Sequence, residues 1–205
     1  MRLDVGQAPL WTGGSLKTTI VNVGYRSTNY WVVSAGASRL LVDLGWPGTM
    51  GEMLANLRRT GVPLTEIRYA LATHYHLDHA GLAQEFKLAG VPLLVLETQV
   101  EAIPNLKAQT KPGDGFIDIS MNDNIVIPFV QSRELLADVG IAGEILPTPG
   151  HSSDSVSLLL DDGCAFTGDL GPVLDWHEEN DVRASWRLLA AKGMSRIYPG
   201  HGPVA

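Results

Sequence analysis

Short apolar and β-branched runs, separated by glycine, serine and asparagine, fill most of the first half of the chain. Because such runs fit the pleated and half-buried surface of a sheet, they predict β-strands. We expect strands there at 16–23, 29–34, 39–43, 68–73 and 92–96. The last third returns to this pattern and predicts strands at 144–146, 156–160, 164–167 and 196–198, with Asp161-Asp162-Gly163 as the turn of a hairpin.

Helical periodicity appears between these runs. Met53, Leu54 and Leu57 form one apolar stripe, which follows Thr49 and Glu52 at the spacing of a capping box. Further helices are expected at 80–89, at 98–103 after a second capping-box pair, and from Asn180 or Asp181 to about 192. Strands and helices alternate irregularly and hairpins are mixed in, which predicts an α/β sandwich with mixed sheets.

Residues 104–130 differ from the rest of the chain because they are polar and rich in turn-forming residues. Long loops in a compact domain usually carry function. We therefore expect this segment to form a mobile lid or one wall of a substrate cleft. A hairpin with long turns is the alternative.

Length and charge narrow the class of protein. At 205 residues the chain is expected to form one domain, 1–205, with a layered core. It shows no apolar run of membrane-spanning length and no apolar signal segment after Met1, so a cytoplasmic location without membrane contact is expected. A formal net charge of −7 without any Lys/Arg run argues against a nucleic-acid partner. The single cysteine, Cys164, excludes an internal disulfide and is expected to be a small buried strand residue.

The segment Thr73-His74-Tyr75-His76-Leu77-Asp78-His79 carries the strongest chemical signal. It holds three of the six histidines and one aspartate, and imidazole and carboxylate are zinc's nitrogen and oxygen donors in proteins. Such a density of donors exceeds what one tetrahedral ion with an open position can use. The segment therefore predicts two neighbouring metal ions.

Three later residues extend this set: His151, Asp169 and His201. Each follows a predicted strand and stands next to a glycine, in Pro149-Gly150-His151, Thr167-Gly168-Asp169 and Pro199-Gly200-His201. Strand ends beside tight turns present side chains at the rim of a sheet, so seven ligands can converge there. The sixth histidine, His177, is expected at the surface or behind the ligands.

These motifs resemble those of the metallo-β-lactamase superfamily, in order and over nearly the whole chain. The matching signatures are His-Tyr-His-Leu-Asp-His-Ala-Gly at 74–81, Pro-Gly-His-Ser at 149–152, Thr-Gly-Asp at 167–169, Pro-Gly-His-Gly at 199–202, and an early strand with an Asp-x-Gly turn at 41–45. The resemblance implies an αββα four-layer sandwich, in which two mixed β-sheets are flanked by helices and the metals lie at one edge.

The resemblance also implies how the ligands are divided. It assigns the first metal to His74, His76 and His151, and the second to Asp78, His79 and His201. Asp169 would bridge both ions, because a carboxylate has two oxygens, and a hydroxide would lie between them. Two divalent ions, zinc with iron or manganese as alternatives, would bring the pKa of this water toward neutrality.

The expected activity is hydrolysis of a small ester, thioester or lactone. Asp78 would be the catalytic residue that orients the nucleophile or passes a proton to the leaving group. The bridging Asp169 is typical of the glyoxalase-II-like and lactonase-like branches of the family. After His201 only Gly-Pro-Val-Ala follows, so the helical domain that binds glutathione thioesters is not expected.

Other functions share these motifs, because a fold does not dictate a reaction. The alternatives are a mononuclear iron persulfide dioxygenase, a β-lactamase or phosphodiesterase, and a metal-stabilised binding module without activity. The partner is expected to be a small-molecule substrate. We expect its cleft to have Tyr25, Tyr30 and Trp46 on one wall and Lys107, Lys111 and Phe116 on the other.

Overall fold

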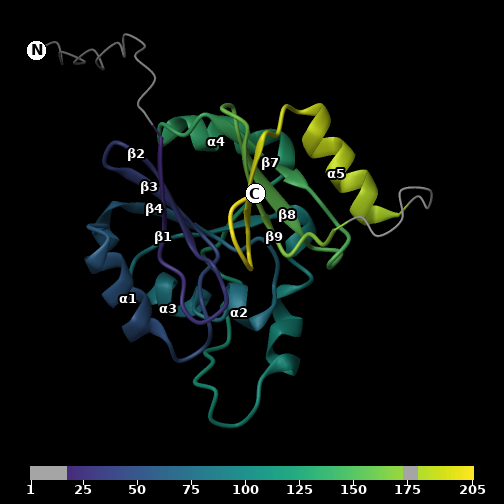
Figure 1. Ribbon diagram of the computed structural model, residues 1–205. Helices are drawn as coiled ribbons and strands as arrows, with labels where there is room; N and C mark the ends of the chain where they lie inside the picture. Colours follow the sequence, from purple (N-terminus) through teal and green to yellow (C-terminus); the bar gives the residue numbers. More distant parts are fainter. Residues whose placement is uncertain (1–17, 173–179) are drawn as a thin grey trace, which may run out of the picture.

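Two β-sheets packed face to face form the centre of the molecule (Figure 1). The structure is a computed structural model, which describes residues 18–172 and 180–205. The first sheet has six strands in sequence order: β1 (Thr19–Asn22), β2 (Trp31–Ala35), β3 (Ser38–Val42), β4 (Ile67–Leu71), β5 (Leu93–Leu96) and β6 (Ile125–Ile127). The second has four, in the order β10 (Arg196–Pro199), β9 (Cys164–Gly168), β8 (Val156–Leu160) and β7 (Gly143–Pro147).

Both sheets are mixed. In the first, β1, β2 and β3 pair antiparallel, and β3 to β6 continue as parallel strands. In the second, β7, β8 and β9 pair antiparallel, and β10 lies parallel to β9. The hairpin predicted at Asp161-Asp162-Gly163 is confirmed, with Gly163 in the left-handed region at a φ of 88°.

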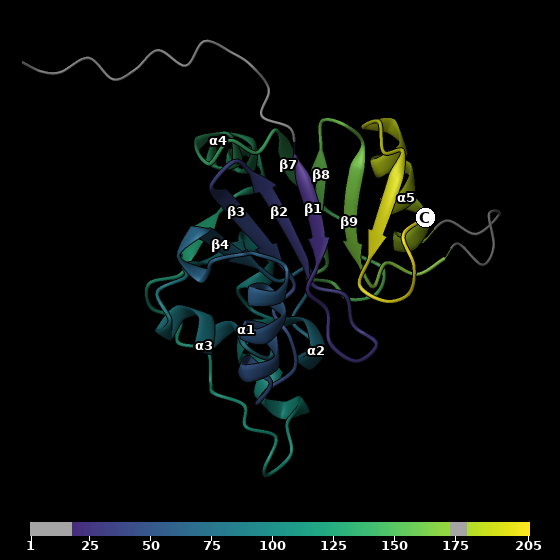
Figure 2. The same cartoon turned by 60° about the vertical axis from the view of Figure 1, so that its left-hand side comes forward.

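Helices cover the outer faces of both sheets, so the layers follow each other as helix, sheet, sheet and helix (Figure 2). The α-helices are α1 (Met50–Arg59), α2 (Leu77–Ala80), α3 (Ala83–Leu88), α4 (Ser132–Asp138) and α5 (Asp181–Ala191). Short 3-10 helices occupy Leu64–Glu66, Glu97–Gln99, Ile103–Gln109 and Phe129–Gln131. Within the described residues, none of these helices has the length and apolarity that crossing a membrane requires.

Three hydrophobic clusters fill the spaces between the four layers. One joins the first sheet to α1 and α3 through residues such as Met53, Leu57 and Phe86. A second fills the space between the sheets, and the third joins the second sheet to α5 around Leu159 and Leu189. This arrangement confirms the predicted αββα sandwich.

Two predicted capping boxes are wrong. Thr49 does stand before α1, but its hydroxyl donates to the carbonyl of Trp46 at 2.7 Å, and its own N–H points to the same oxygen. The tight turn after Trp46 thus takes both groups that a capping box with Glu52 would use. At 98–103 there is no single helix, because Gln99 accepts from the N–H of Leu96 and a new 3-10 helix starts at Ile103.

The segment after that 3-10 helix also differs from the expectation. Residues 125–127 form β6, which pairs parallel to β5, so the alternative of a hairpin at 104–130 is wrong. The helix α4, which the sequence pattern did not predict, follows at Ser132 and buries Leu136 in the core between the sheets. The expected helix at 80–89 starts earlier, at Leu77, and is interrupted between α2 and α3.

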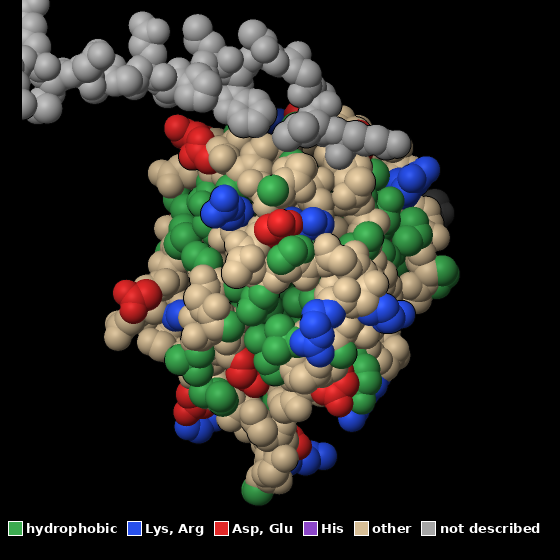
Figure 3. All heavy atoms as spheres, turned by 90° about the vertical axis from the view of Figure 1, so that its left-hand side faces the viewer, with side chains coloured by type: hydrophobic (Ala, Val, Ile, Leu, Met, Phe, Trp, Pro, Cys, Tyr) green, Lys and Arg blue, Asp and Glu red, His purple; other side chains and the backbone are tan. Residues whose placement is uncertain are grey.

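The ligand-bearing loops leave the sheets at the end of the sandwich where α2 lies, opposite α4 (Figures 1 and 2). On the face that looks onto α1 and the outer strands, charged side chains of both signs are scattered and no histidine of the described residues is visible (Figure 3). The histidine-rich edge therefore opens on another side of the molecule.

Candidate metal centre

Four strand ends bring the seven predicted ligand side chains together. The chain leaves β4, passes through His74 and His76, and enters α2, whose first turn carries Asp78 and His79. His151 stands between β7 and β8. Asp169 follows β9 directly, and His201 follows β10 by two residues. Both sheets thus contribute to one site.

Three histidines form the first group. His76 Nδ1 lies 3.1 Å from His74 Nε2 and 3.0 Å from His151 Nε2. Nitrogen ligands on a tetrahedral ion with bonds of about 2.0 Å lie roughly 3.3 Å apart, so this spacing is close to that of a ligand set. His74 is buried and His151 is open to solvent, which leaves one side of the group accessible.

Asp78, His79 and His201 form the second group. The Oδ2 of Asp78 lies 3.1 Å from His201 Nε2 and 3.4 Å from His79 Nε2. His79 is fully buried and His201 is partly exposed. The six members of the two groups are those that the sequence predicts for two separate ions.

Asp169 lies between the two groups. Its Oδ1 is 3.2 Å from His79 Nε2, and its Oδ2 is 3.4 Å from His201 Nε2 and 3.7 Å from His151 Nε2. One carboxylate therefore faces nitrogens of both groups at once.

Several features of the site fit a bound cation. His79 is surrounded by the carboxylates of Asp43, Asp78 and Asp169, a surplus of negative charge in a buried place. In addition, the buried His79 Nε2 and Asp169 Oδ1 make no regular hydrogen bond in the described part of the chain. Buried polar atoms normally have partners, so a ring nitrogen and a carboxylate oxygen that face one another without one indicate a bound group that both would contact.

The pKa values reflect this crowding. Burial and the neighbouring His79 hold the pKa of His74 down to about 2, which keeps this imidazole neutral and able to bind a cation. Burial alone would lower the pKa of His79, but the Asp43 carboxylate and the contact with Asp169 raise it to about 12. Burial would raise the pKa of Asp78, yet its contact with His79 holds it below the usual range.

A buried carboxylate that the site prediction missed orients His79. The Nδ1 of His79 lies 2.9 Å from Asp43 Oδ2, while Asp43 Oδ1 accepts from the N–H and the hydroxyl of Thr73. Asp43 is 1 % exposed and has a left-handed φ of 65°. Such a carboxylate behind a histidine fixes the ring and directs its other nitrogen outward. The signal in the sequence was the Asp-x-Gly turn after β3.

Two glycines allow the ligand loops to approach each other. A Cβ on Gly168, which has a φ of 53°, would lie 2.3 Å from Thr73 Oγ1. A Cβ on Gly200 would lie 2.5 Å from Asp169 Oδ1 and 2.6 Å from His79 Cε1. Both distances are far below van der Waals contact, so side chains at these positions would push the ligands apart.

The residues predicted for the first wall of the cleft separate into two kinds. Tyr25 and Trp46 are partly exposed and flank Arg26, whose guanidinium lies 5.4 Å and 6.0 Å from their ring centroids. Tyr30 is 1 % exposed and belongs to the core between the first sheet and α1. Its ring therefore has no open surface to offer a substrate in this structure.

The residues predicted for the opposite wall lie along the segment 104–130. Lys107 pairs with Asp118, and the N–H of Lys111 donates to Asp114. Phe116 is partly buried against the hydrophobic cluster that joins the first sheet to α1 and α3. Gln109 donates to the carbonyl of Tyr75, which ties this segment to the loop between His74 and His76.

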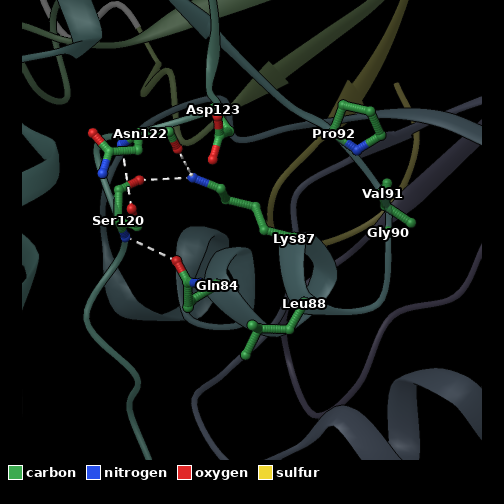
Figure 4. Close-up of a pocket in the computed structure, with 9 residues that line it drawn as sticks. All are labelled: Gln84, Lys87, Leu88, Gly90, Val91, Pro92, Ser120, Asn122 and Asp123. Atoms are coloured by element: carbon green, nitrogen blue, oxygen red, sulfur yellow. Dashed lines mark hydrogen bonds between the residues drawn. The ribbon is translucent and has the colours of Figure 1, made fainter.

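Two hollows in the described structure are lined by none of the seven candidate ligands. One, of about 230 Å³, is lined by residues that include Phe116, Lys107 and Met121. The other, of about 320 Å³, lies between α3 and the turn at 120–124, where Lys87 reaches toward Ser120 and Asn122 (Figure 4).

His177, for which a surface or supporting position was expected, lies outside the described residues.

Sequence comparison places the chain in a known family. The family model of the metallo-β-lactamase superfamily matches residues 23–201. A protein of Methanocaldococcus jannaschii, named as a probable metallo-hydrolase, is 26% identical over an alignment of 198 residues that covers 88% of this chain and 90% of that protein. An atrochrysone carboxyl ACP thioesterase of Aspergillus fumigatus is 29% identical over 188 residues. That match takes in 87% of this chain and 52% of the thioesterase, so the chain spans about half of that relative's length.

Solved structures share the fold. A metallo-β-lactamase of Cronobacter sakazakii has a TM-score of 0.68 at 20% identity, covering 89% of this chain and 75% of that one. A protein solved in a di-iron-bound form has a TM-score of 0.68 at 24% identity, covering 91% and 93%. The chain therefore belongs to the metallo-β-lactamase superfamily, and it is a metal-dependent hydrolase of that fold.

Proposed function

We propose that this hydrolase uses two metal ions, with zinc as the expected metal, to cleave a small ester, thioester or lactone. The observation that carries the proposal is the position of Asp169 between the two groups. Its Oδ1 faces His79 of the second group, and its Oδ2 lies 3.4 Å from His201 of that group and 3.7 Å from His151 of the first. A single ion would leave one group without a role. The relative named as a thioesterase supports acyl transfer to water as the class of reaction.

The residues divide between the two ions as their positions indicate. His74, His76 and His151 would hold the first ion, and Asp78, His79 and His201 the second, with Asp169 shared. When bound, two such ions supply an activated water near neutral pH and polarise the carbonyl of the substrate. The protein contributes a rigid geometry, because the ligands stand in helix α2 and in the loops that follow four strand ends.

Asp78 is the residue proposed to handle the proton. Its low pKa keeps the carboxylate ionised at neutral pH, so that it can accept a proton from an attacking water. The hydroxyl of Thr28 donates to Asp78 Oδ2 at 3.2 Å and His201 contacts the same oxygen, which holds the carboxylate in one orientation. Once it has taken up this proton, the oriented carboxyl group would return it to the leaving group and become ionised again.

The substrate, a small molecule, is proposed to bind between Tyr25 and Trp46 on one side and the segment 104–130 on the other. The contact of Gln109 with the carbonyl of Tyr75 supports this, since it places the segment beside the histidine loop. A Cβ on Gly115 would lie 3.1 Å from the Cα of Gly48, which places the segment beside the turn after Trp46 as well.

Iron is the competing metal. A protein of the same fold is described in a di-iron-bound form, and histidine with carboxylate suits iron as well as zinc. A single iron would instead favour the oxidation of a persulfide. Metal content therefore separates the two candidate functions.

Elemental analysis of the purified chain, followed by a substrate panel, tests the proposal. We expect two metal ions per chain and turnover of at least one ester, thioester or lactone that chelation abolishes and zinc restores. Measured oxygen uptake on a persulfide, with one iron per chain and no hydrolysis, would overturn it.

The variant Asp169→Ala tests the shared ligand. Removing the one carboxylate that faces both groups is expected to weaken metal binding at both positions and to lower turnover at least tenfold, since preorganised charge supplies much of the rate. Metal titration and kinetics of the same preparation check this. A variant with two tightly bound ions and normal turnover contradicts the bridging role.

A further inference from the structure

The tip of the β1–β2 hairpin carries an arginine that the sequence motifs did not single out. Tyr25 and Thr28 pair across a two-residue turn, with the N–H of Tyr25 donating to Thr28 at 3.2 Å. Arg26, inside this turn, has a φ of 59°, a conformation uncommon for a residue other than glycine. In both cartoon views the loop between β1 and β2 lies beside α2, the helix of Asp78 and His79 (Figures 1 and 2).

This turn is joined directly to the candidate metal ligands. The Thr28 hydroxyl donates to Asp78 at 3.2 Å, and the Ser27 carbonyl lies 2.8 Å from His201 Nδ1. Thr28 and His201 also form an isolated β-bridge. The position of Arg26 is therefore set by contacts that its next two residues make with the second ligand group.

The guanidinium of Arg26 is held but not neutralised. It lies over the rings of Tyr25 and Trp46, and stacking on aromatic faces orients such a group without removing its charge. The side chain is exposed, and it forms no ion pair with any residue that the structure describes. Lys107, the expected attractor of an acidic substrate, is by contrast already paired with Asp118.

We propose that Arg26 binds a carboxylate of the substrate and thereby selects acyl compounds that carry one, such as half-esters of dicarboxylic acids. A planar guanidinium matches a planar carboxylate through two parallel hydrogen bonds. The inference rests on the proposed acyl hydrolysis for its substrate class, but carboxylate binding can be measured without any turnover. Arg26 thus sets specificity, while the seven ligands carry out the reaction.

Two matched pairs of compounds test this in the metal-loaded protein. Calorimetry compares glutaramate, which carries a carboxylate, with the neutral glutaramide, and neither compound is an ester. Kinetics compares 4-nitrophenyl hydrogen glutarate with 4-nitrophenyl valerate, a neutral ester whose acyl chain has the same number of carbons. The variants are Arg26→Gln, Arg26→Lys and, as a control for the lost charge, Arg58→Gln in the exposed last turn of α1. The metal content of each variant is measured alongside.

The wild type is expected to prefer the carboxylate compound in both assays. In Arg26→Gln this preference should fall about tenfold, as loss of a charge-assisted hydrogen-bond pair implies, with Arg26→Lys intermediate and Arg58→Gln unchanged. If Arg26→Gln keeps the preference, or the wild type has none in calorimetry, the inference is wrong. If calorimetry shows the effect but neither ester is hydrolysed, Arg26 binds carboxylates and the proposed hydrolysis fails instead.

Discussion

Asp43 and Thr73 illustrate how the site depends on residues that touch no metal. Asp43 is buried at the end of β3, and it accepts both the N–H and the hydroxyl of Thr73 while it contacts His79 Nδ1. These contacts leave His79 Nε2 directed toward Asp78 and Asp169. Since a histidine ligand binds through one nitrogen only, the carboxylate behind it selects which one.

Replacing Asp43 by asparagine keeps the shape of the side chain but removes the charge that faces His79. We expect the affinity for the second equivalent of zinc to fall about 10- to 100-fold, because such supporting carboxylates fix ligand orientation. Zinc titration of the chelator-treated protein against a competing dye measures it. Asp138→Asn, at the exposed end of α4, is the control. If Asp43→Asn binds the second equivalent of zinc as tightly as the wild type does, the orienting role is contradicted.

Gly200 is a residue at the candidate site where space is limiting. A Cβ there would lie 2.5 Å from Asp169 Oδ1 and 2.6 Å from His79 Cε1. We expect Gly200→Ala to lower the free energy of unfolding by about 1–3 kcal/mol, as overpacking does, and to reduce the bound metal.

The control for this variant is Gly51→Ala in α1, where nothing lies within 4 Å of the new Cβ. That change should be neutral or stabilising by about 0.5–1 kcal/mol, since alanine favours a helix more than glycine does. Urea denaturation and elemental analysis of both variants provide the comparison. A Gly200→Ala protein with two metals and unchanged stability shows that the loops can move apart freely.

Among the secondary-structure elements, α3 holds the loop before β6 in place. Lys87 on this helix donates to the carbonyls of Ser120 and Asn122 at 2.7 Å and 2.6 Å (Figure 4). It also donates to the side chain of Asn124. The turn at 120–124 leads directly into β6, an edge strand of three residues. Lys87 therefore joins α3 to the turn that precedes this short strand.

Lys87→Met should destabilise the protein by about 1–3 kcal/mol, the range for hydrogen bonds from a charged donor. Lys192→Met is the matched control, because Lys192 makes an exposed ion pair with Glu144 that is expected to contribute no more than about 1 kcal/mol. Thermal and urea unfolding of the two variants give the comparison. Similar losses in both would mean that Lys87 acts as an ordinary surface cation.

At the scale of the whole molecule, the candidate site joins the two halves of the sandwich. His74, His76, Asp78 and His79 come from the first sheet, and His151, Asp169 and His201 come from the second. An ion bound by both sets connects the sheets at their open edge. A ligand that binds only the folded state adds to its stability.

Chelation should therefore lower the melting temperature. At a metal concentration of 100 times Kd the gain is about 2.7 kcal/mol, which corresponds to a shift of roughly 5–10 °C for a chain of this size. Calorimetry with and without chelator measures the shift, and Asp169→Ala should show less of it. An identical melting temperature in both states contradicts a metal that bridges the sheets.

The ligand types could be predicted from the sequence because the signal is local. Each candidate ligand stands beside a glycine turn or within six residues of another histidine, and the chemistry of such short motifs does not depend on the fold. The strands were predictable for a similar reason, since alternation and β-branching act over a few residues. The helix α4 and the strand β6 were missed, because their sequences are short and gain most of their stability from packing against the sheets.

The contacts between distant segments required the folded structure. Thr28 meets Asp78 across 50 positions and Ser27 meets His201 across 174, and no pattern along the chain indicates either pair. The same is true of Asp43 behind His79, of the buried position of Tyr30, and of the Arg26 guanidinium over the ring of Trp46. Local motifs identify which side chains can bind a metal, whereas the packing of two sheets determines which of them meet and which neighbours face the substrate.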